Sequence, residues 1–379
     1  MEAHLQIILM MFVLCGSVAA CIYLWRWMVY KKYISVDRDN TPAMAISEIM
    51  LNVSLWGCIS VSFSIFNSFF YTVYQGRGFP FPCFTTTLHM LIQCMATRVY
   101  ASAKGIEVSP LPATTTLLVV APIGISSGLD IALSNYSFET ISVSAYTVIK
   151  SSNVIFIFIF GLIMGLEQLD VCVLMSVVCI VIGFCVSMYG FKDTNLWGLV
   201  ACLSATIISA LRWTLVHFLV RHDDQSRNPI VVLHRISFPA FLSMLPVFLY
   251  YEFYDLVEYI AEDESANYLQ TSFLISCGGT LGILLVLLEI NVLSLTSSLT
   301  FSVIGAAKEV LQVSLAVIVL QDGVTKTKII GIGISLISVL WYNVLKTRRS
   351  PDELKNGDDR NSTLSSPGAG YIRVAANEL

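Results

Sequence analysis

ISVSAYTVIKSSNVIFIFIFGLIM, residues 141–164, is an apolar run that holds a single charged residue, Lys150, near its middle. A helix that crosses a bilayer needs about 20 consecutive apolar residues, and this run is long enough. A charge at that depth costs about 2.5–3.5 kcal/mol on insertion scales, so it marks a functional group or a paired one. The stretch therefore predicts a membrane-spanning helix with a lysine buried inside it.

Similar runs lie on both sides of this one. The chain of 379 residues is 56% apolar and 13% charged, whereas soluble domains carry about 25% charged residues. Because backbone groups in lipid must be paired internally, and no barrel-like alternation is present, we expect an all-α integral membrane protein. The predicted spans are 6–28, 48–73, 84–103, 113–134, 141–164, 168–190, 196–220, 229–251, 269–291, 296–319 and 328–345.

The spans after the first form two halves of nearly equal length. Each half has five predicted helices, an odd number, so the halves must lie in opposite orientations, as in the inverted repeats of secondary transporters. The two halves share a short sequence similarity: YTVIK at 146–150 and FSVI at 301–304, followed by Lys308, each have an aromatic residue, a hydroxyl residue, Val-Ile and then a lysine. The predicted organisation is an extra N-terminal helix with a basic cytosolic linker (1–47), a first five-helix repeat (48–190), a second five-helix repeat (191–346) and a disordered cytosolic tail (347–379).

The orientation follows from the basic residues. The span 6–28 has no basic residues before it and several after it, so it is interpreted as a helix rather than a cleaved signal peptide. The positive-inside rule then puts the N-terminus in the lumen and the C-terminus in the cytosol. Most loop lysines and arginines fall on the same cytosolic side, and the acidic loop 251–268 falls on the other.

Charged residues at membrane depth are the candidates for function. Lys150 shares a helical face with Tyr146, Thr147 and Asn153, and Lys308 shares one with Gly305 and Gln312. A lysine flanked by hydroxyl, amide and aromatic groups suits an anionic ligand such as a phosphate. The alternative is structural: Lys150 would neutralise Asp130, and Lys308 would neutralise Glu309 or Glu289. Asp130 and Arg212 are interpreted as ion-pair partners. Glu309 could pair with a lysine or could carry a coupling proton.

Several function classes are excluded by the sequence. A formal charge of −4 gives no basic excess for nucleic acid, and no metal-binding, cofactor-binding or hydrolase motif is present. The ten cysteines are interpreted as small apolar helix residues rather than disulfides or metal ligands. We therefore expect a non-enzymatic membrane protein without a metal or cofactor; its oligomeric state, with a homodimer as one option, is left open.

Four stretches carry a resemblance to a known family. SNYSFETISVSAYTVIKSS (134–152) and TSSLTFSVIGAAKEV (296–310) resemble the signatures of the triose-phosphate/nucleotide-sugar transporters, within the drug/metabolite transporter superfamily. LRWTL (211–215) with RNPI (227–230) is similar to solute carrier family 35, subfamily C, which includes the GDP-fucose transporter. The resemblance covers about residues 49–346.

The resemblance implies a ten-helix carrier of the Golgi or ER–Golgi membrane. Such a carrier exchanges a cytosolic nucleotide sugar for a nucleoside monophosphate, and the subfamily points to GDP-fucose or another GDP-sugar. Lys150 and Lys308 match the family's phosphate-facing lysines, and Tyr146 matches a neighbouring pocket position. Glu309 follows Lys308 where plastid triose-phosphate exchangers have arginine, which argues against a small divalent phosphate. The extra helix 6–28 is outside the usual plan.

Two rival hypotheses come from other classes. The chain could be a member of the family that no longer transports and instead regulates a partner carrier or a glycosyltransferase. Related members often end their first helix with Phe-Asn-Lys, where this chain has Phe66-Asn67-Ser68, and this departure and the extra N-terminal helix motivate the hypothesis. It could also be a proton-coupled exporter of an uncharged or cationic metabolite that uses Glu309. Loss of Lys150 or Lys308 would abolish exchange under the leading hypothesis only.

Overall fold

The computed structural model describes residues 42–72, 79–141, 152–187, 195–262 and 268–308, a few positions between 146 and 150, and scattered positions near both ends of the chain. All regular elements in these ranges are helices. The first group is α2 (Pro42–Thr72), α3 (Pro82–Lys104), the continuous stretch α4 (Ala113–Thr115), η2 (Thr116–Val120) and α5 (Ala121–Thr140), α7 (Asn153–Ile163) and α8 (Val171–Ser187). The second group is α9 (Leu196–His222), η3 (Asp224–Arg227), α10 (Pro229–Tyr251), α11 (Phe253–Glu262) and α12 (Tyr268–Leu295), and residues 298–308 are also helical.

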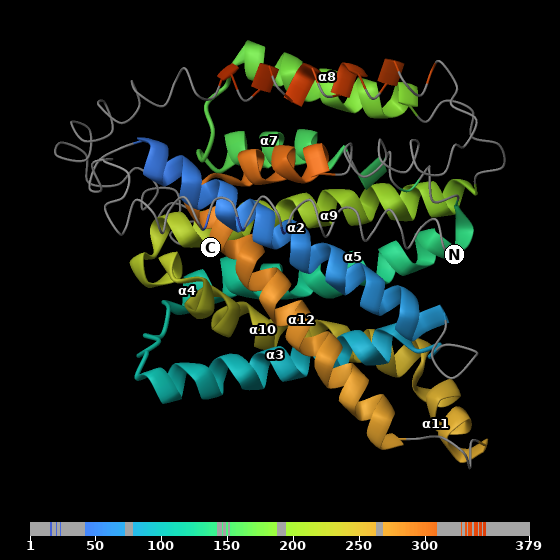
Figure 1. The fold of residues 1–379 in the computed structure, drawn as a ribbon. Coiled ribbons are helices and arrows are strands. Elements are labelled where there is room, and N and C mark those ends of the chain that lie inside the picture. Colours follow the sequence, from blue (N-terminus) through green and yellow to red (C-terminus); the bar gives the residue numbers. More distant parts are fainter. Residues whose placement is uncertain are drawn as a thin grey trace.

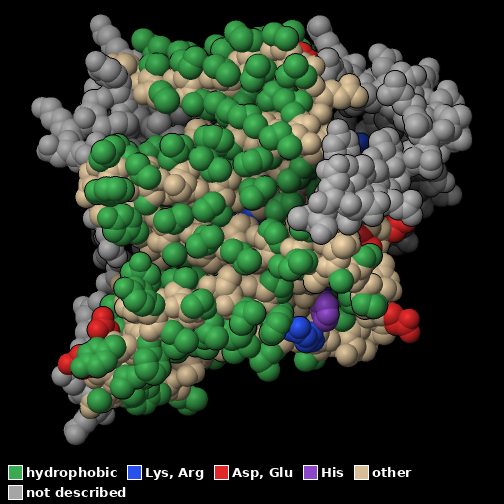
Figure 2. All heavy atoms as spheres, turned by 180° about the vertical axis from the view of Figure 1, so that it is seen from behind, with side chains coloured by type: hydrophobic (Ala, Val, Ile, Leu, Met, Phe, Trp, Pro, Cys, Tyr) green, Lys and Arg blue, Asp and Glu red, His purple; other side chains and the backbone are tan. Residues whose placement is uncertain are grey.

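Four of the described helical stretches are long and apolar enough to cross a membrane. They are Ala113–Ser137, Leu196–His222, Pro229–Tyr251 and Tyr268–Leu295. Large apolar side chains are exposed along them, and in Figure 2 hydrophobic side chains cover most of the visible face, with few charges. Such a surface is a liability in water but suits lipid. The all-helical membrane architecture expected from the sequence is confirmed at this level.

Helix ends follow local sequence. Asn195 and Asn228 cap α9 and α10 by accepting N–H bonds from Trp197 and Ile230. Gly105 ends α3 in the left-handed conformation, with φ of 63°, which glycine adopts without steric cost. These signals explain why the predicted start of α10 and its observed start coincide.

The helices of the two groups interleave (Figure 1). α5 packs on α9 and α10, α3 packs on α10 and α12, α2 packs on α12, and α7 packs on α9. In the predicted repeat, the helices α2, α3 and α5 of the first half correspond in order to α9, α10 and α12 of the second. The contact of α5 with α9 then has its counterpart in the contact of α12 with α2, and the contact of α5 with α10 has its counterpart in that of α12 with α3. The α7–α9 contact corresponds to the contact of residues 298–308 with α2, made by Phe301 on Trp56. An inverted repeat would produce these matching contacts. They support the predicted boundary between the two repeats at about residue 190, which stays a prediction.

Small residues allow α5 and α10 to approach closely. A Cβ added to Gly124 would lie 2.3 Å from the Cβ of Pro239, and one added to Gly128 would lie 2.7 Å from the hydroxyl of Ser243. Ser243 also donates to the carbonyl of Gly124 at 2.7 Å. Without a hydrophobic driving force between helices in lipid, such close packing is a main source of association.

The segment interpreted as an acidic loop, 251–268, is in part a helix, α11. Its amphipathic pattern was missed because acidic residues fill one face while Leu256 and Tyr259 pack inward. At its start, Glu252 accepts backbone N–H bonds from Cys83 at 2.8 Å and Phe84 at 2.7 Å. The carboxylate thus caps α3, whose first N–H groups have no partner within the helix.

The loop between α9 and α10 is held by an ion pair between Arg235 and Asp223. The guanidinium also donates to the hydroxyl of Ser226, and only 6% of the arginine side chain is exposed. Burial alone would raise the pKa of Asp223, but hydrogen bonds from Arg235 and Ser226 outweigh it and hold the pKa below its usual range. Arg235 therefore has a structural partner at the end of the helix.

Candidate functional site

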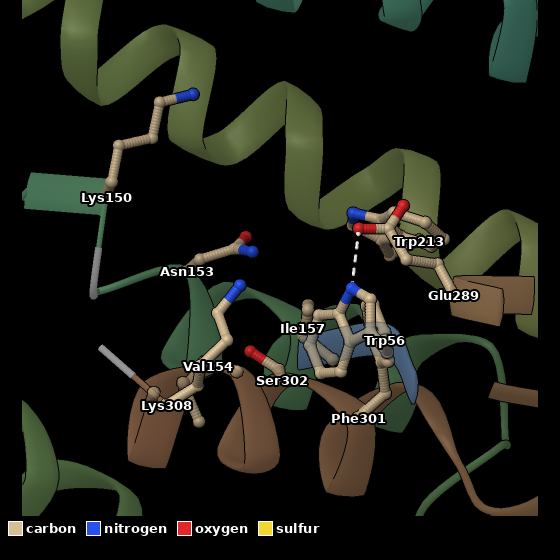
Figure 3. Close-up of a pocket in the computed structure, with 12 residues that line it drawn as sticks. Trp56, Lys150, Asn153, Val154, Ile157, Trp213, Glu289, Phe301, Ser302 and Lys308 are labelled. Carbon is tan, nitrogen blue, oxygen red and sulfur yellow. Dashed lines mark hydrogen bonds between the residues drawn. The ribbon is translucent and has the colours of Figure 1, made fainter. Parts of the chain in front are cut away.

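A cavity of about 220 Å³ lies between α2, α7, α9, α12 and the helical residues 298–308 (Figure 3). Both lysines singled out in the sequence line it, one from each half of the chain. Its walls are otherwise aromatic, apolar and amide-bearing, with one carboxylate. The lining residues are Trp56, Lys150, Asn153, Val154, Ile157, Trp213, Glu289, Phe301, Ser302, Gly305, Ala306 and Lys308.

Lys150 reaches the cavity from just before α7 and is paired. Its Nζ lies 2.6 Å from Oδ1 of Asp130 on α5, and Arg212 of α9 lies 3.5 Å from the other carboxylate oxygen. The side chains of Lys150 and Asp130 are 20% and 13% exposed. Its ammonium also lies 5.7 Å from the ring centre of Tyr146. One carboxylate therefore faces two cations, and this part of the site keeps a positive balance.

Among the described residues no carboxylate forms a close ion pair with Lys308, although the charge of Glu289 in the same cavity wall interacts with it. Its Nζ donates to the hydroxyl of Ser60 at 3.0 Å and lies 4.7 Å from the ring centre of Trp56. Ser60 and Trp56 are one turn apart on α2, so the same face of that helix supplies both contacts. Gly305, one turn before the lysine, faces the same indole; a Cβ there would lie 3.7 Å from it. A cation held by a hydroxyl and a π face keeps its charge available to an anion.

The predicted single helix over 141–164 is interrupted beside the cavity. Tyr146, Ile149 and Lys150 are helical, Ser152 is in a turn, and α7 begins at Asn153. Ser152 makes a turn, with its N–H bonded to the carbonyl of Ile149 at 3.0 Å. The N-terminus of α7 carries partial positive charge and has no side-chain cap, as suits an anion site.

Asn153 lies at this helix start, between the two lysines in Figure 3. Its Oδ1 is buried and accepts no hydrogen bond from any described residue. Buried amide oxygens normally have a donor, so a group that enters the cavity would meet an acceptor waiting for one.

The opposite end of the cavity is aromatic and acidic. The indole N–H of Trp56 donates to Oε1 of Glu289 at 3.2 Å. Phe301 stacks on Trp56 with ring centres 5.1 Å apart and lies 4.8 Å from Trp213. Glu289, which the sequence offers as a possible partner of Lys308, thus lies in the cavity wall together with that lysine.

The structure gathers four of the predicted site residues around the cavity: Lys150, Asn153, Gly305 and Lys308. Tyr146 lies beside Lys150 and is not among the cavity-lining residues, while Asp130 forms ion pairs with Lys150 and Arg212. The other three lie outside the described residues: Thr147, Glu309 and Gln312.

Trp56, Ser60 and Glu289 were missed as site residues. Trp56 and Ser60 carry no signal in an apolar span where tryptophan and serine are ordinary helix residues. The carboxylate of Glu289 is such a signal, since a charge inside an apolar run is costly. Within the described part of the chain, no cluster of histidine, cysteine and acidic residues could hold a metal ion.

Comparison with known proteins identifies the family. Residues 47–343 match the model of the Triose-phosphate Transporter family. The chain belongs to this family. The match spans both predicted halves and every cavity-lining residue.

Curated relatives and a solved structure also match over most of the chain. A protein of Arabidopsis thaliana named as a probable sugar phosphate/phosphate translocator is 24% identical over 88% of this chain and 81% of its own. UDP-uronic acid transporter 1 of the same plant is 24% identical over 77% of this chain and 94% of its own. A crystal structure with 16% identity covers 81% of this chain and 99% of its own with a TM-score of 0.54, a likeness of fold.

Proposed function

We propose that the chain is a nucleotide-sugar/nucleoside-monophosphate antiporter, with GDP-fucose or another GDP-sugar as the first candidate substrate. The observation that carries the proposal is Lys308: an ammonium in the cavity whose direct contacts are a hydroxyl and an indole ring, with no close ion pair to a described carboxylate. A charge inside a membrane-spanning run is costly unless it is paired or serves a ligand, and the direct contacts of Lys308 leave it accessible to an anion in the cavity. The phosphates of the substrate would lie between Lys308, Lys150 and the start of α7.

The transport cycle would follow from the interleaved halves. The cavity lies between helices of both halves, as substrate sites do in inverted-repeat carriers, where rocking of one half against the other exposes the site alternately. An empty site with excess positive charge disfavours reorientation, because the charge lacks its counterion in a low dielectric. A bound phosphate would remove that barrier, so exchange would be favoured over one-way flux.

The carrier would work in the secretory pathway. The proposed location is the Golgi or ER–Golgi membrane, with the N-terminus in the lumen and the C-terminus in the cytosol, as the basic residues of the loops indicate. There it would take a nucleotide sugar from the cytosol and return the nucleoside monophosphate left after glycosyl transfer.

Sugar phosphate/phosphate exchange is a second candidate. Several relatives are named as sugar phosphate/phosphate translocators. The cavity of about 220 Å³ is also below the range of about 300–1,000 Å³ typical of pockets for drug-sized ligands. A sugar phosphate would fit with little rearrangement, whereas a nucleotide sugar would require the helices to part.

Counterflow in proteoliposomes separates the two candidates. Vesicles with the full chain are preloaded with GMP, UMP, AMP, CMP or inorganic phosphate, and uptake of labelled nucleotide sugars and sugar phosphates is measured. Uptake of a GDP-sugar only with GMP inside supports the leading proposal, and uptake of a sugar phosphate only with phosphate inside supports the second. Folded protein that exchanges none of these would contradict both.

A further inference from the structure

The two ends of the cavity differ in chemistry (Figure 3). Lys150, Asn153 and Lys308 lie toward one end, while Glu289 lies at the other beside Trp56 and Trp213. A phosphate suits the first end and is repelled by a carboxylate at the second. The cavity therefore matches a ligand with an anionic part and, close to it, a neutral part that donates hydrogen bonds.

Glu289 makes one hydrogen bond within the described chain, and its charge also interacts with those of Arg212 and Lys308. The indole N–H of Trp56, which can only donate, bonds to Oε1 at 3.2 Å. Oε2 accepts no hydrogen bond from the rest of the described chain. Oε2 is therefore available for a hydrogen bond with a ligand in the cavity.

We propose that Glu289 is a specificity-determining residue that accepts a hydroxyl of the sugar through Oε2, with Trp56 as its positioning residue. The inference rests on the proposed transport of a phosphorylated sugar and adds which part of the ligand the acidic end recognises. It applies to a nucleotide sugar and to a sugar phosphate alike, because in both a phosphate is attached directly to the sugar.

Proximity favours a sugar hydroxyl over a nucleobase. Lys308 and Glu289 both contact the indole of Trp56, through its face at 4.7 Å and its N–H at 3.2 Å. The phosphate-binding and acidic groups are therefore separated by little more than one ring. A sugar bonded to its phosphate spans that interval, whereas a base is separated from the nearest phosphate by ribose.

The aromatic contacts also favour the hydroxyl. Trp56 is stacked on Phe301 and covered by the ammonium of Lys308, and the guanidinium of Arg212 lies 4.6 Å from the ring centre of Trp213. These rings hold charged side chains in place instead of presenting an open face on which a planar base could stack.

The test compares matched ligands with and without the sugar. Binding of GDP-fucose against GDP, and of glucose 6-phosphate against inorganic phosphate, is measured by ligand-induced thermal protection of the purified full chain. We expect Glu289→Gln to weaken the sugar-bearing member of the pair that the wild type binds by about tenfold or more, the effect of a hydrogen bond to a charged group. The sugar-free member should not be weakened.

Two further variants control the result. Glu258→Gln makes the same change on the exposed face of α11 and should leave both ligands within twofold of wild type. Trp56→Phe removes the N–H and also reduces the ring beside Lys308, so both ligands should weaken, the sugar-bearing one by more. This variant decides the matter if Glu289→Gln does not fold.

The outcomes distinguish the inference from the function on which it rests. Equal weakening of both members of a pair, or no change in either, would overturn the role of Glu289 while leaving transport of phosphorylated sugars intact. A folded wild type that is protected by neither sugar-bearing ligand would overturn the proposed function, and the inference with it.

Discussion

Asp130 is the residue whose removal should cost the fold most at the site. It accepts a hydrogen bond from Lys150 at 2.6 Å, and Arg212 lies 3.5 Å away, while only 13% of its side chain is exposed. Asp130→Asn keeps the size of the side chain but leaves two neighbouring cations without their shared counter-charge. The variant should therefore be destabilised even in the absence of any ligand.

The magnitude follows from the geometry. Removing one partner of a buried ion pair costs about 3–5 kcal/mol, and the residual exposure of these side chains reduces the expected loss to about 2–3 kcal/mol. Lys150→Met should cost less, about 1 kcal/mol, because Asp130 keeps Arg212. In the double variant the two losses should fall short of additivity by about 1 kcal/mol or more.

Unfolding of the detergent-purified full chain, followed by heat or denaturant, measures these losses. The control is Asp224→Asn, since Asp224 is 91% exposed and its pair with Arg227 should contribute less than about 0.5 kcal/mol. The ion pair shared by Asp130, Lys150 and Arg212 does not stabilise the site if Asp130→Asn has the same unfolding midpoint as this control. The same conclusion follows if the stability loss of the double variant equals the sum of the two single losses within about 0.5 kcal/mol.

Three other predictions concern the scaffold. Gly124→Ala should destabilise the chain by about 1–3 kcal/mol, because its methyl group would overlap Pro239; unfolding midpoints equal to wild type would contradict this. The lowered pKa of Asp223 means that its pairing with Arg235 stabilises the fold above the usual aspartate pKa of about 4 and is lost as pH falls below it, so Asp223→Asn should lower the midpoint at pH 7 and much less near pH 3. Glu252→Gln should lose about 1–2 kcal/mol with the cap of α3, and hydrogen exchange should rise first in that helix rather than uniformly.

Much of the scaffold could be predicted from sequence because lipid imposes simple rules. Apolar runs between polar turns set α9 and α10 within two residues of their predicted ends, and Asn228 before Pro229 marks a helix start by itself. The interruption before Asn153 could not be predicted in this way, because serine pairs are compatible with a helix and the break depends on packing around the cavity. α11 was missed since its acidic face resembles a loop.

The site residues likewise include some that the sequence could predict and some that it could not. The two lysines could be predicted because a charge inside an apolar run is rare and costly. Trp56 could not, because its role lies in a contact with Glu289, 233 residues away, and tryptophan is common in such helices. Long-range pairs of this kind depend on how the helices assemble, so only the structure brings them together.

The most direct test of the central claim removes the charge of Lys308. Counterflow and ligand-induced thermal protection are compared for wild type, Lys308→Gln and Lys104→Gln, the last at the exposed end of α3 as a matched control. We expect Lys308→Gln to fold as wild type does but to lose about a hundredfold of its affinity for the phosphorylated ligand, the effect of a charge-assisted contact of about 3 kcal/mol. Exchange and protection at wild-type levels in Lys308→Gln would contradict the claim that this lysine holds the substrate's phosphate.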